Sequence, residues 1–223
     1  IAGTALGDGF VLELADGGAV QTLRVLLAMG MRYESPAVPG LAELWGSSVF
    51  HCPFCHGWEV RDQPLAVLAN GERAVHMATM LRGWSDDVVL LTNGPADFTD
   101  DHRPRLADAG VTVDERVVAE LSSAEGELAA VVFGDGTSLA RRGLLVATTL
   151  HQRTALASKL GVDLAAAGPV SVEPVGVDAL YRTSVPGVFA AGDVCAQMPQ
   201  VAAAIAAGSA AAASVVASFL EEK

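Results

Sequence analysis

The stretch TSVPGVFAAGD, residues 183–193, contains the pattern that decides the fold of this chain. The pair Pro186-Gly187 marks a turn, and the apolar residues after it predict a short buried strand that ends at Gly192-Asp193. A glycine at the end of a strand permits close approach to the backbone, and the carboxylate of Asp193 can accept hydrogen bonds from hydroxyl groups. The stretch therefore predicts a strand with a ligand-binding turn at its end.

An alanine-rich segment without any charged residue follows, from Val194 to Leu220. We expect a helix there that begins near Gln200, and the N-terminus of such a helix attracts anionic or carbonyl oxygens. The segment is long enough to span a bilayer, but Ala contributes little transfer energy compared with Leu or Ile. We therefore expect a buried helix of the protein interior rather than a membrane span.

The stretch HCPFCHGWE, residues 51–59, carries the chemistry. Cys52 and Cys55 have the spacing of a pair that opens and closes a disulfide easily, with the thiolate as the reactive species. His56 is adjacent and can hold or deliver a proton near neutral pH. The residue types and their spacing favour a redox-active pair.

Three other interpretations compete for the same cysteines. Cys-x-x-Cys-His is also the attachment motif of c-type haem, which requires export and a distal ligand. The cysteines and the flanking His51 and His56 could bind zinc, but an adjacent His and Cys cannot easily point at one metal, and no second ligand pair follows. Two buried, inert thiols are the third alternative.

The segments around the cysteines alternate between strands and helices. We predict strands at residues 10–14, 21–28, 64–69, 87–92, 111–113 and 143–147, helices at 74–81 and 100–109, and an antiparallel set at 117–121, 128–133 and 138–139. A strand, a glycine turn, a helix and a second strand within about thirty residues form a βαβ unit, whose strands run parallel. The prolines and glycine of residues 36–40 predict a linker.

The turn of the first βαβ unit, residues 69–74, differs from a dinucleotide-binding fingerprint. Gly71 is kept, but Ala69 stands at the first glycine position, and Glu72 places a carboxylate where a pyrophosphate would lie. The second strand ends at Asn93-Gly94, which offers no acidic group for a ribose and no basic group for a 2′-phosphate. We predict a Rossmann shape with weak or no binding of NADP(H).

The composition excludes several classes of protein. The 223 residues include 14 Lys and Arg against 26 Asp and Glu, a formal net charge of −12. Phosphate backbones and acidic membrane surfaces repel such a chain, so we expect neither nucleic-acid nor membrane binding. Three cysteines are fewer than a secreted disulfide scaffold carries, and no signal peptide is visible. We expect a cytoplasmic protein.

Residues 183–193 resemble the second flavin-binding motif of the two-domain flavoprotein disulfide reductases. With a Cys-x-x-Cys inside a βαβ insert, the whole chain is similar to the thioredoxin reductase-like family. The run CPFCHGWE resembles the branch that includes dithiol oxidases of the gliotoxin and holomycin type.

This resemblance implies an α/β fold with two Rossmann-like three-layer domains, FAD as the cofactor, and a homodimer. A flavin domain in two sequence pieces, residues 1–38 and 151–223, would enclose an inserted nicotinamide-type domain, residues 39–150, that carries the cysteines. The N-terminal strand and glycine-rich loop that hold the FAD pyrophosphate in the family are absent from this sequence.

The resemblance also implies roles for single residues. Cys52 would meet the substrate, Cys55 would lie nearer the flavin, and His56 stands where thioredoxin reductases carry an acidic proton donor. The sequence Ala28-Met29-Gly30 matches the family's Ala-Thr-Gly, with Met29 in place of Thr. The residues expected at the flavin are Gly30, Gly192, Asp193, Gln200, Val201 and Ala202.

Three functions agree with these residues. The first is a dithiol oxidase that forms disulfides in a small molecule or peptide and passes the electrons to oxygen. The second is an NAD(P)H-dependent reductase of a thioredoxin-like protein. The third is a non-catalytic flavin-fold or metal-binding module with structural cysteines. The altered nucleotide turn favours the first function over the second.

We predict that Cys52→Ser and Cys55→Ser each abolish dithiol turnover, because a single thiol cannot form the internal disulfide. Circular dichroism should show an intact fold in both variants. Cys195→Ser is the matched control and should keep wild-type activity. Retained turnover in either of the first two variants would contradict the redox assignment.

Overall fold

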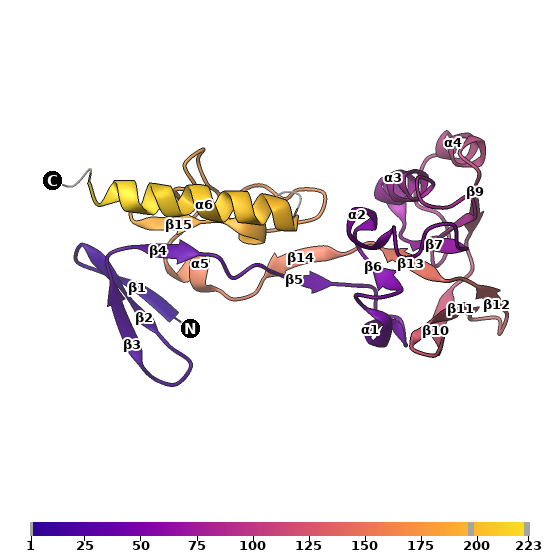
Figure 1. The fold of residues 1–223 in the computed structure, drawn as a ribbon, viewed down its shortest axis with the longest axis horizontal. Coiled ribbons are helices and arrows are strands. Elements are labelled where there is room, and N and C mark those ends of the chain that lie inside the picture. Colours follow the sequence, from indigo (N-terminus) through magenta and orange to yellow (C-terminus); the bar gives the residue numbers. More distant parts are fainter. Residues whose placement is uncertain (1, 196–198, 221–223) are drawn as a thin grey trace. The chain divides into compact units, whose positions relative to one another are not determined.

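The computed structural model describes residues 2–195 and 199–220. The chain forms two compact units, of which one, Ser35–Thr148, is inserted in the sequence of the other, Ile1–Glu34 with Thr149–Lys223 (Figure 1).

A five-stranded parallel sheet forms the middle of the inserted unit. Its strands, in spatial order, are β6 (Val49–Phe50), β13 (Gly143–Val146), β7 (Leu65–Leu68), β8 (Val88–Leu91) and β9 (Val111–Asp114). All four neighbouring pairs are parallel. The strands predicted at residues 64–69, 87–92, 111–113 and 143–147 are confirmed as β7, β8, β9 and β13, and the parallel pairing predicted for the βαβ unit is confirmed for β7 and β8. The two-residue β6 carries too little pattern to be predicted.

Both faces of this sheet are covered. Helices α3 (Gly71–Leu81) and α4 (His102–Asp108) pack on one face. The other face is covered by α1 (Leu41–Leu44) and an antiparallel sheet of β10 (Val118–Ala124), β11 (Glu127–Phe133) and β12 (Ser138–Ala140). Alternate residues of β7 therefore enter different cores, because successive side chains of a strand point to opposite faces.

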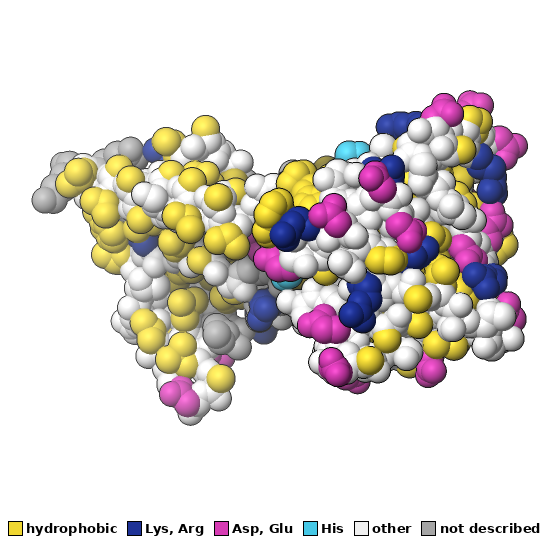
Figure 2. Space-filling model, turned by 45° about the vertical axis from the view of Figure 1, so that its right-hand side comes forward, with side chains coloured by type: hydrophobic (Ala, Val, Ile, Leu, Met, Phe, Trp, Pro, Cys, Tyr) yellow, Lys and Arg dark blue, Asp and Glu magenta, His cyan; other side chains and the backbone are white. Residues whose placement is uncertain are grey.

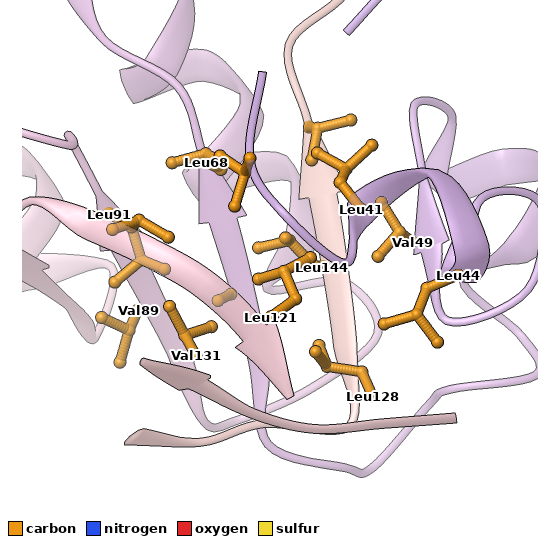
Figure 3. Close-up of a cluster of buried hydrophobic side chains, with 14 of the residues drawn as sticks. Leu41, Leu44, Val49, Leu68, Val89, Leu91, Leu121, Leu128, Val131 and Leu144 are labelled. Atoms are coloured by element: carbon orange, nitrogen blue, oxygen red, sulfur yellow. The ribbon is translucent and has the colours of Figure 1, made fainter. Parts of the chain in front are cut away.

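The core beneath the antiparallel sheet is formed by branched aliphatic side chains (Figure 3). Leu68, Leu91 and Leu144 point from the parallel strands toward Leu121 and Val131 of the antiparallel strands (Figure 3). Burial of this kind contributes about 25 cal/mol for each Å² of apolar surface removed from water. It therefore joins the two sheets into one unit.

The second unit is built on the parallel pair β4 (Val25–Leu27) and β15 (Val188–Ala190). Helix α6 (Val201–Ser218) packs along β15 (Figure 1). The remaining elements are the antiparallel sheet β1 (Ala2–Leu6), β2 (Gly9–Glu13) and β3 (Ala19–Thr22), the antiparallel pair β5 (Met31–Glu34) and β14 (Thr149–Gln152), the helix α5 (Leu156–Lys159) and the 3₁₀ turn η1 (Gly192–Val194). The strand predicted within residues 183–193 is confirmed as β15.

Two expectations for this unit are wrong. Residues 21–28 do not form one strand, because the chain leaves β3 after Thr22 and joins a different sheet as β4. A hydrogen bond from the Thr22 hydroxyl to the Arg24 carbonyl marks the break.

The second correction concerns the alanine-rich helix, which begins after Gln200 as predicted but is not buried as a whole. Only Ala207, Ala211 and Ser214 of α6 are buried, and Val201 is 76% exposed. Figure 2 shows hydrophobic side chains gathered on the surface of this unit. By length and composition alone, α6 is the one helix among the described residues that could cross a membrane.

We predict that Leu144→Ala lowers the free energy of unfolding of the inserted unit by about 2–5 kcal/mol, the usual cost of a cavity in a packed core. Leu144 is fully buried on β13, between β6 and β7. Tryptophan fluorescence in urea reports on this unit, because Trp45, Trp58 and Trp84 all lie in it.

Val117→Ala is the control, because Val117 is 58% exposed. This variant should stay within about 0.5 kcal/mol of the wild type. Equal losses in both variants would contradict the core assignment.

Candidate active site

The two cysteines belong to a single helical turn that follows β6, Cys52 at its start and Cys55 within it. Helix α2 (Pro53–His56) has Cys52 as its N-cap residue and Pro53 at its first position, where a fixed φ and a missing N–H favour a helix start. The amides of Cys55 and His56 donate to the carbonyl of Cys52, at 3.1 and 3.3 Å. The turn therefore brings the side chains three positions apart to the same side.

The two thiols are in contact. The Sγ of Cys55 donates a hydrogen bond to the Sγ of Cys52 at 2.9 Å. This hydrogen bond is the main cause that raises the pKa of the Cys55 thiol to about 11, and burial contributes further. Cys55 thus keeps its proton at neutral pH. The exposed Cys55 and half-buried Cys52 contradict the alternative of two buried thiols.

Both histidines beside the cysteines are held by ring stacking. The ring of His56 lies 5.9 Å from that of Phe50 and nearly parallel to it, and His51 lies 5.7 Å from Trp45 in the same manner. The Nδ1 of His56 is buried without a hydrogen-bond partner in the part of the chain that the structure describes. Proton transfer by His56 must therefore use Nε2.

The nucleotide turn between β7 and α3 is occupied by a side chain of the protein. Asn70 is the N-cap of α3, and its Oδ1 accepts from the amides of Gly71 and Asp97 at 2.9 and 2.8 Å. Its Nδ2 donates to the carbonyls of Thr92 and Pro95 at 3.2 and 2.9 Å. All four hydrogen-bonding positions of the amide group are thus used.

The other polar side chains around this turn also have partners. The carboxylate of Glu72 contacts the imidazole of His102 of α4, with 3.0 Å between Oε2 and Nε2, and the Nδ1 of His102 contacts the Thr99 hydroxyl at 2.8 Å. Arg73 donates to the carbonyl of Thr148 at 2.8 Å. A phosphate at this turn would meet a carboxylate and find the nearest amide already bonded, which disfavours an anion.

The residues expected at the flavin gather in the other unit, around the end of β15. Gly192 has a φ of 78°, in the left-handed region that favours glycine. One cavity of about 210 Å³ is lined by Gly30, Gly192 and Asp193, and another of about 190 Å³ by Asp193 and Gln200. The structure thus brings together four of the six expected residues.

The other two expected residues and Cys195 complete this region. Val201 and Ala202 lie in the exposed first turn of α6 and line neither cavity. The Cys195 thiol donates toward the carbonyl of Gly192 at 3.3 Å, and burial raises its pKa. Cys52, Cys55 and His56 belong to the inserted unit.

Two residues with clear roles in the geometry carried little signal in the sequence. His102 contacts Glu72, which lies thirty residues earlier, and Trp84, which follows α3, packs under the cysteine turn. Asn70 did carry a signal, because an Asn at the junction of a strand and a helix is a recognised N-cap residue. Among the described residues, no three His, Cys, Asp or Glu side chains form a group that could hold a metal ion.

The chain matches the family of pyridine nucleotide-disulphide oxidoreductases over residues 7–208, and it belongs to that family. Thioredoxin reductase aclD of Aspergillus oryzae is 32% identical over 200 residues, which cover 86% of this chain and 63% of the relative. Thioredoxin reductase sirT of Leptosphaeria maculans is 31% identical over 198 residues, covering 83% and 59%. The chain spans about three fifths of the length of these relatives.

Solved structures agree in fold. An oxidoreductase from Agrobacterium tumefaciens superposes with a TM-score of 0.90 at 33% identity, covering 100% of this chain and 73% of that one. The structure of HlmI superposes with a TM-score of 0.89 at 37% identity, covering 99% and 68%. The predicted thioredoxin reductase-like α/β fold of Rossmann type is confirmed.

Members of this family depend on FAD. The residues of this chain fit a part of that cofactor. Gly192 leaves space at the end of β15, where an added Cβ would meet only the Cβ of Ala204 at 3.7 Å, and the carboxylate of Asp193 lines both adjacent cavities. A flexible, hydroxyl-bearing chain such as the ribityl group of FAD suits a turn of this kind.

We predict that His56→Gln slows dithiol turnover by about two to four orders of magnitude, the usual contribution of a positioned proton carrier. Glutamine can hydrogen-bond from a similar position but cannot carry a proton near neutral pH. The measurement is the steady-state rate of the flavin-loaded protein with dithiothreitol.

His76→Gln, an exposed change on α3, serves as the control and should leave that rate unchanged. If His51→Gln proves more damaging than His56→Gln, the proton-transfer role belongs to His51.

Proposed function

We propose that this protein is an FAD-dependent dithiol oxidase that converts a dithiol into a disulfide with oxygen as the electron acceptor. In the net reaction the two thiols lose two hydrogens, dioxygen gains them as hydrogen peroxide, and one S–S bond forms. The observation that carries this proposal lies in the turn after β7. There the Oδ1 of Asn70 accepts hydrogen bonds from the amides of Gly71 and Asp97, so the amide of Gly71 is not free for a nucleotide phosphate.

The reaction begins with the Cys52–Cys55 pair as a disulfide. A substrate thiolate attacks the Sγ of Cys52, the S–S bond breaks, and Cys55 leaves with the electron pair. The second substrate thiolate then attacks the mixed disulfide, so that the substrate leaves oxidised and both cysteines are reduced. Exchange in this order makes Cys52 the residue that meets the substrate.

The leaving sulfur needs a proton. A thiolate of high pKa is a poor leaving group, and the contact with Cys52 raises the pKa of the Cys55 thiol to about 11. His56 follows Cys55 directly in the chain, and only its Nε2 is available for the transfer. We assign His56 to deliver this proton and to accept it again when the pair is reoxidised.

Gly30, Gly192, Asp193 and Gln200 would hold FAD at the end of β15, and Val201 and Ala202 would lie near its pyrimidine part. When bound, FAD supplies the chemistry that accepts two electrons from the dithiol and returns them to oxygen. The contribution of this chain to that chemistry is to bind and orient the cofactor.

The nucleotide turn supports a dithiol rather than NADPH as the source of electrons. A phosphate would have to displace Asn70 from Gly71 and lie near the carboxylate of Glu72. A lost charge-assisted contact to a phosphate costs a few kcal/mol, which is enough to move a micromolar affinity toward millimolar. Oxygen needs no such binding site.

A thioredoxin-type reductase driven by NAD(P)H is the second candidate. The names of the relatives aclD and sirT, both thioredoxin reductases, favour it. The two candidates share the redox pair and the cofactor, and they differ only in the origin and destination of the electrons.

Stopped-flow reduction of the full-length, flavin-loaded protein under nitrogen separates the two candidates. We expect dithiothreitol to bleach the flavin within seconds and NADPH at micromolar concentration to leave it unchanged. On admission of air, the flavin colour should return with formation of one hydrogen peroxide for each dithiol consumed.

Rapid bleaching by micromolar NADPH without any dithiol would instead identify a reductase. The variant Cys52→Ser is the internal control, because it must lose the response to dithiothreitol if the electrons enter through the pair.

A further inference from the structure

The redox turn is too short to hold its own shape. Helix α2 has four residues, and no side chain caps its N-terminus. An isolated helix of this length is unstable in water, because too few hydrogen bonds offset the entropy of fixing its backbone. Its geometry must therefore come from the residues packed against it.

Gly57 at the end of the turn reveals one of these packing partners. Its φ of −63° and ψ of −28° are ordinary helical values that any residue adopts, so the backbone conformation does not require glycine. The available space does require glycine. An added Cβ would meet the carbonyl oxygen of Pro53 within the turn, and it would lie 2.6 Å from the Nε1 and 2.7 Å from the Cδ1 of Trp84. The indole thus lies directly against the backbone of the turn.

The same indole contacts Phe54, one of the two residues between the cysteines. Phe54 is 71% exposed, and its ring meets the ring of Trp84 edge to face, with centroids 5.2 Å apart and planes 81° apart. Such pairs contribute beyond their buried area. Trp84 therefore contacts the redox turn at Phe54, in its middle, and at Gly57, at its end.

Trp84 itself is firmly fixed. It packs on the core of α3 and α4, and its amide donates to the carbonyl of Leu81 at 3.0 Å. The amide of Asp62 donates to the carbonyl of Trp84 at 2.8 Å, which ties the segment after the redox turn to the same point. The contacts on Phe54 and Gly57 are thus made from a rigid support.

Trp58 provides a contrast within the same stretch of sequence. It is 68% exposed, and its ring is covered by the guanidinium of Arg61, 3.9 Å from the ring centroid. Among the residues that the structure describes, Trp84 packs against the hydrophobic core of this unit and Trp58 is not part of it. The two tryptophans therefore form a matched pair for experiments.

We infer that Trp84 is a positioning residue for the Cys52–Cys55 pair, whose indole holds the turn so that the two sulfur atoms face each other in contact. This inference rests on the proposed function, in which the pair cycles between dithiol and disulfide. The sulfur atoms are 2.9 Å apart, and a disulfide needs about 2.0 Å. Two thiols held in near-contact have a high effective concentration toward each other, which favours formation of the disulfide. A turn that is held less firmly lowers this effective concentration.

The test is the equilibrium of the pair with glutathione in the full-length protein. Disulfide closure passes two electrons and two protons from the cysteines to glutathione disulfide, which becomes two glutathione molecules. Differential alkylation and mass spectrometry of the peptide that contains residues 52 and 55 give the oxidised fraction at each glutathione ratio. No turnover is needed for this measurement.

We expect Trp84→Leu to lower the oxidation equilibrium constant about tenfold, which is a shift of about 30 mV for a two-electron couple. Trp84→Phe keeps an aromatic ring under the turn and should stay within about threefold of the wild type. Trp58→Leu is the control and should not shift the equilibrium.

The pH dependence of Cys55 alkylation provides an independent readout. The pKa of the Cys55 thiol is raised to about 11 chiefly by the contact with Cys52. Separation of the sulfur atoms removes that contact, so the pKa should fall toward its ordinary value in Trp84→Leu. A loss of thermal stability alone would not produce this change.

An equilibrium constant in Trp84→Leu equal to that of the wild type overturns the role of Trp84, whatever its thermal stability. If Trp84→Leu fails to fold by circular dichroism, Phe54→Leu decides, because it removes the same ring contact from the exposed side. If the oxidation equilibrium constant of Phe54→Leu equals that of the wild type, the inference is overturned. A shift of this equilibrium toward the dithiol supports the inference. A wild-type pair that stays reduced at every glutathione ratio refutes the proposed function itself.

Discussion

The burial of a parallel sheet on both of its faces is the constraint on which the inserted unit depends. Strands connected in parallel need crossover helices, and their continuous apolar runs must be covered from both sides. Helices α3 and α4 supply one cover, and β10–β12 with α1 supply the other. The carboxyl ends of β6, β7 and β8 then meet at one edge of the sheet, where the cysteine turn and the nucleotide turn begin.

At this edge the two turns have opposite character. The nucleotide turn is closed by bonds of the protein to itself, with Asn70 on the backbone and Glu72 on His102. The cysteine turn offers an exposed thiol in contact with a second thiol, next to a histidine whose Nδ1 is buried. The same edge of the sheet thus carries one turn whose polar groups are bonded to the protein itself and one turn whose thiols are exposed or half-buried.

Predictions from the sequence succeeded where periodicity within one element carried the information. The strands β7, β8, β9 and β13 of the inserted unit, the strand at residues 10–14 and the start of α6 after Gln200 follow from such local patterns. The prediction of one continuous strand at residues 21–28 failed, because β3 and β4 pair with strands of two different sheets and the local pattern does not show where one pairing ends. The prediction that α6 is buried failed, because an apolar composition does not indicate which face of a helix packs against the rest of the protein.

The sequence by itself determined that Cys52 and Cys55 fall on the same side of one helical turn, since side chains three positions apart share a face of a helix. It also determined the strand and glycine at 188–192, because that signal is local. Only the tertiary structure decided that Glu72 meets His102 and that Trp84 lies beneath Gly57. These partners are separated by about thirty residues, and their contact depends on how helices and strands pack, which no short-range pattern in the chain encodes.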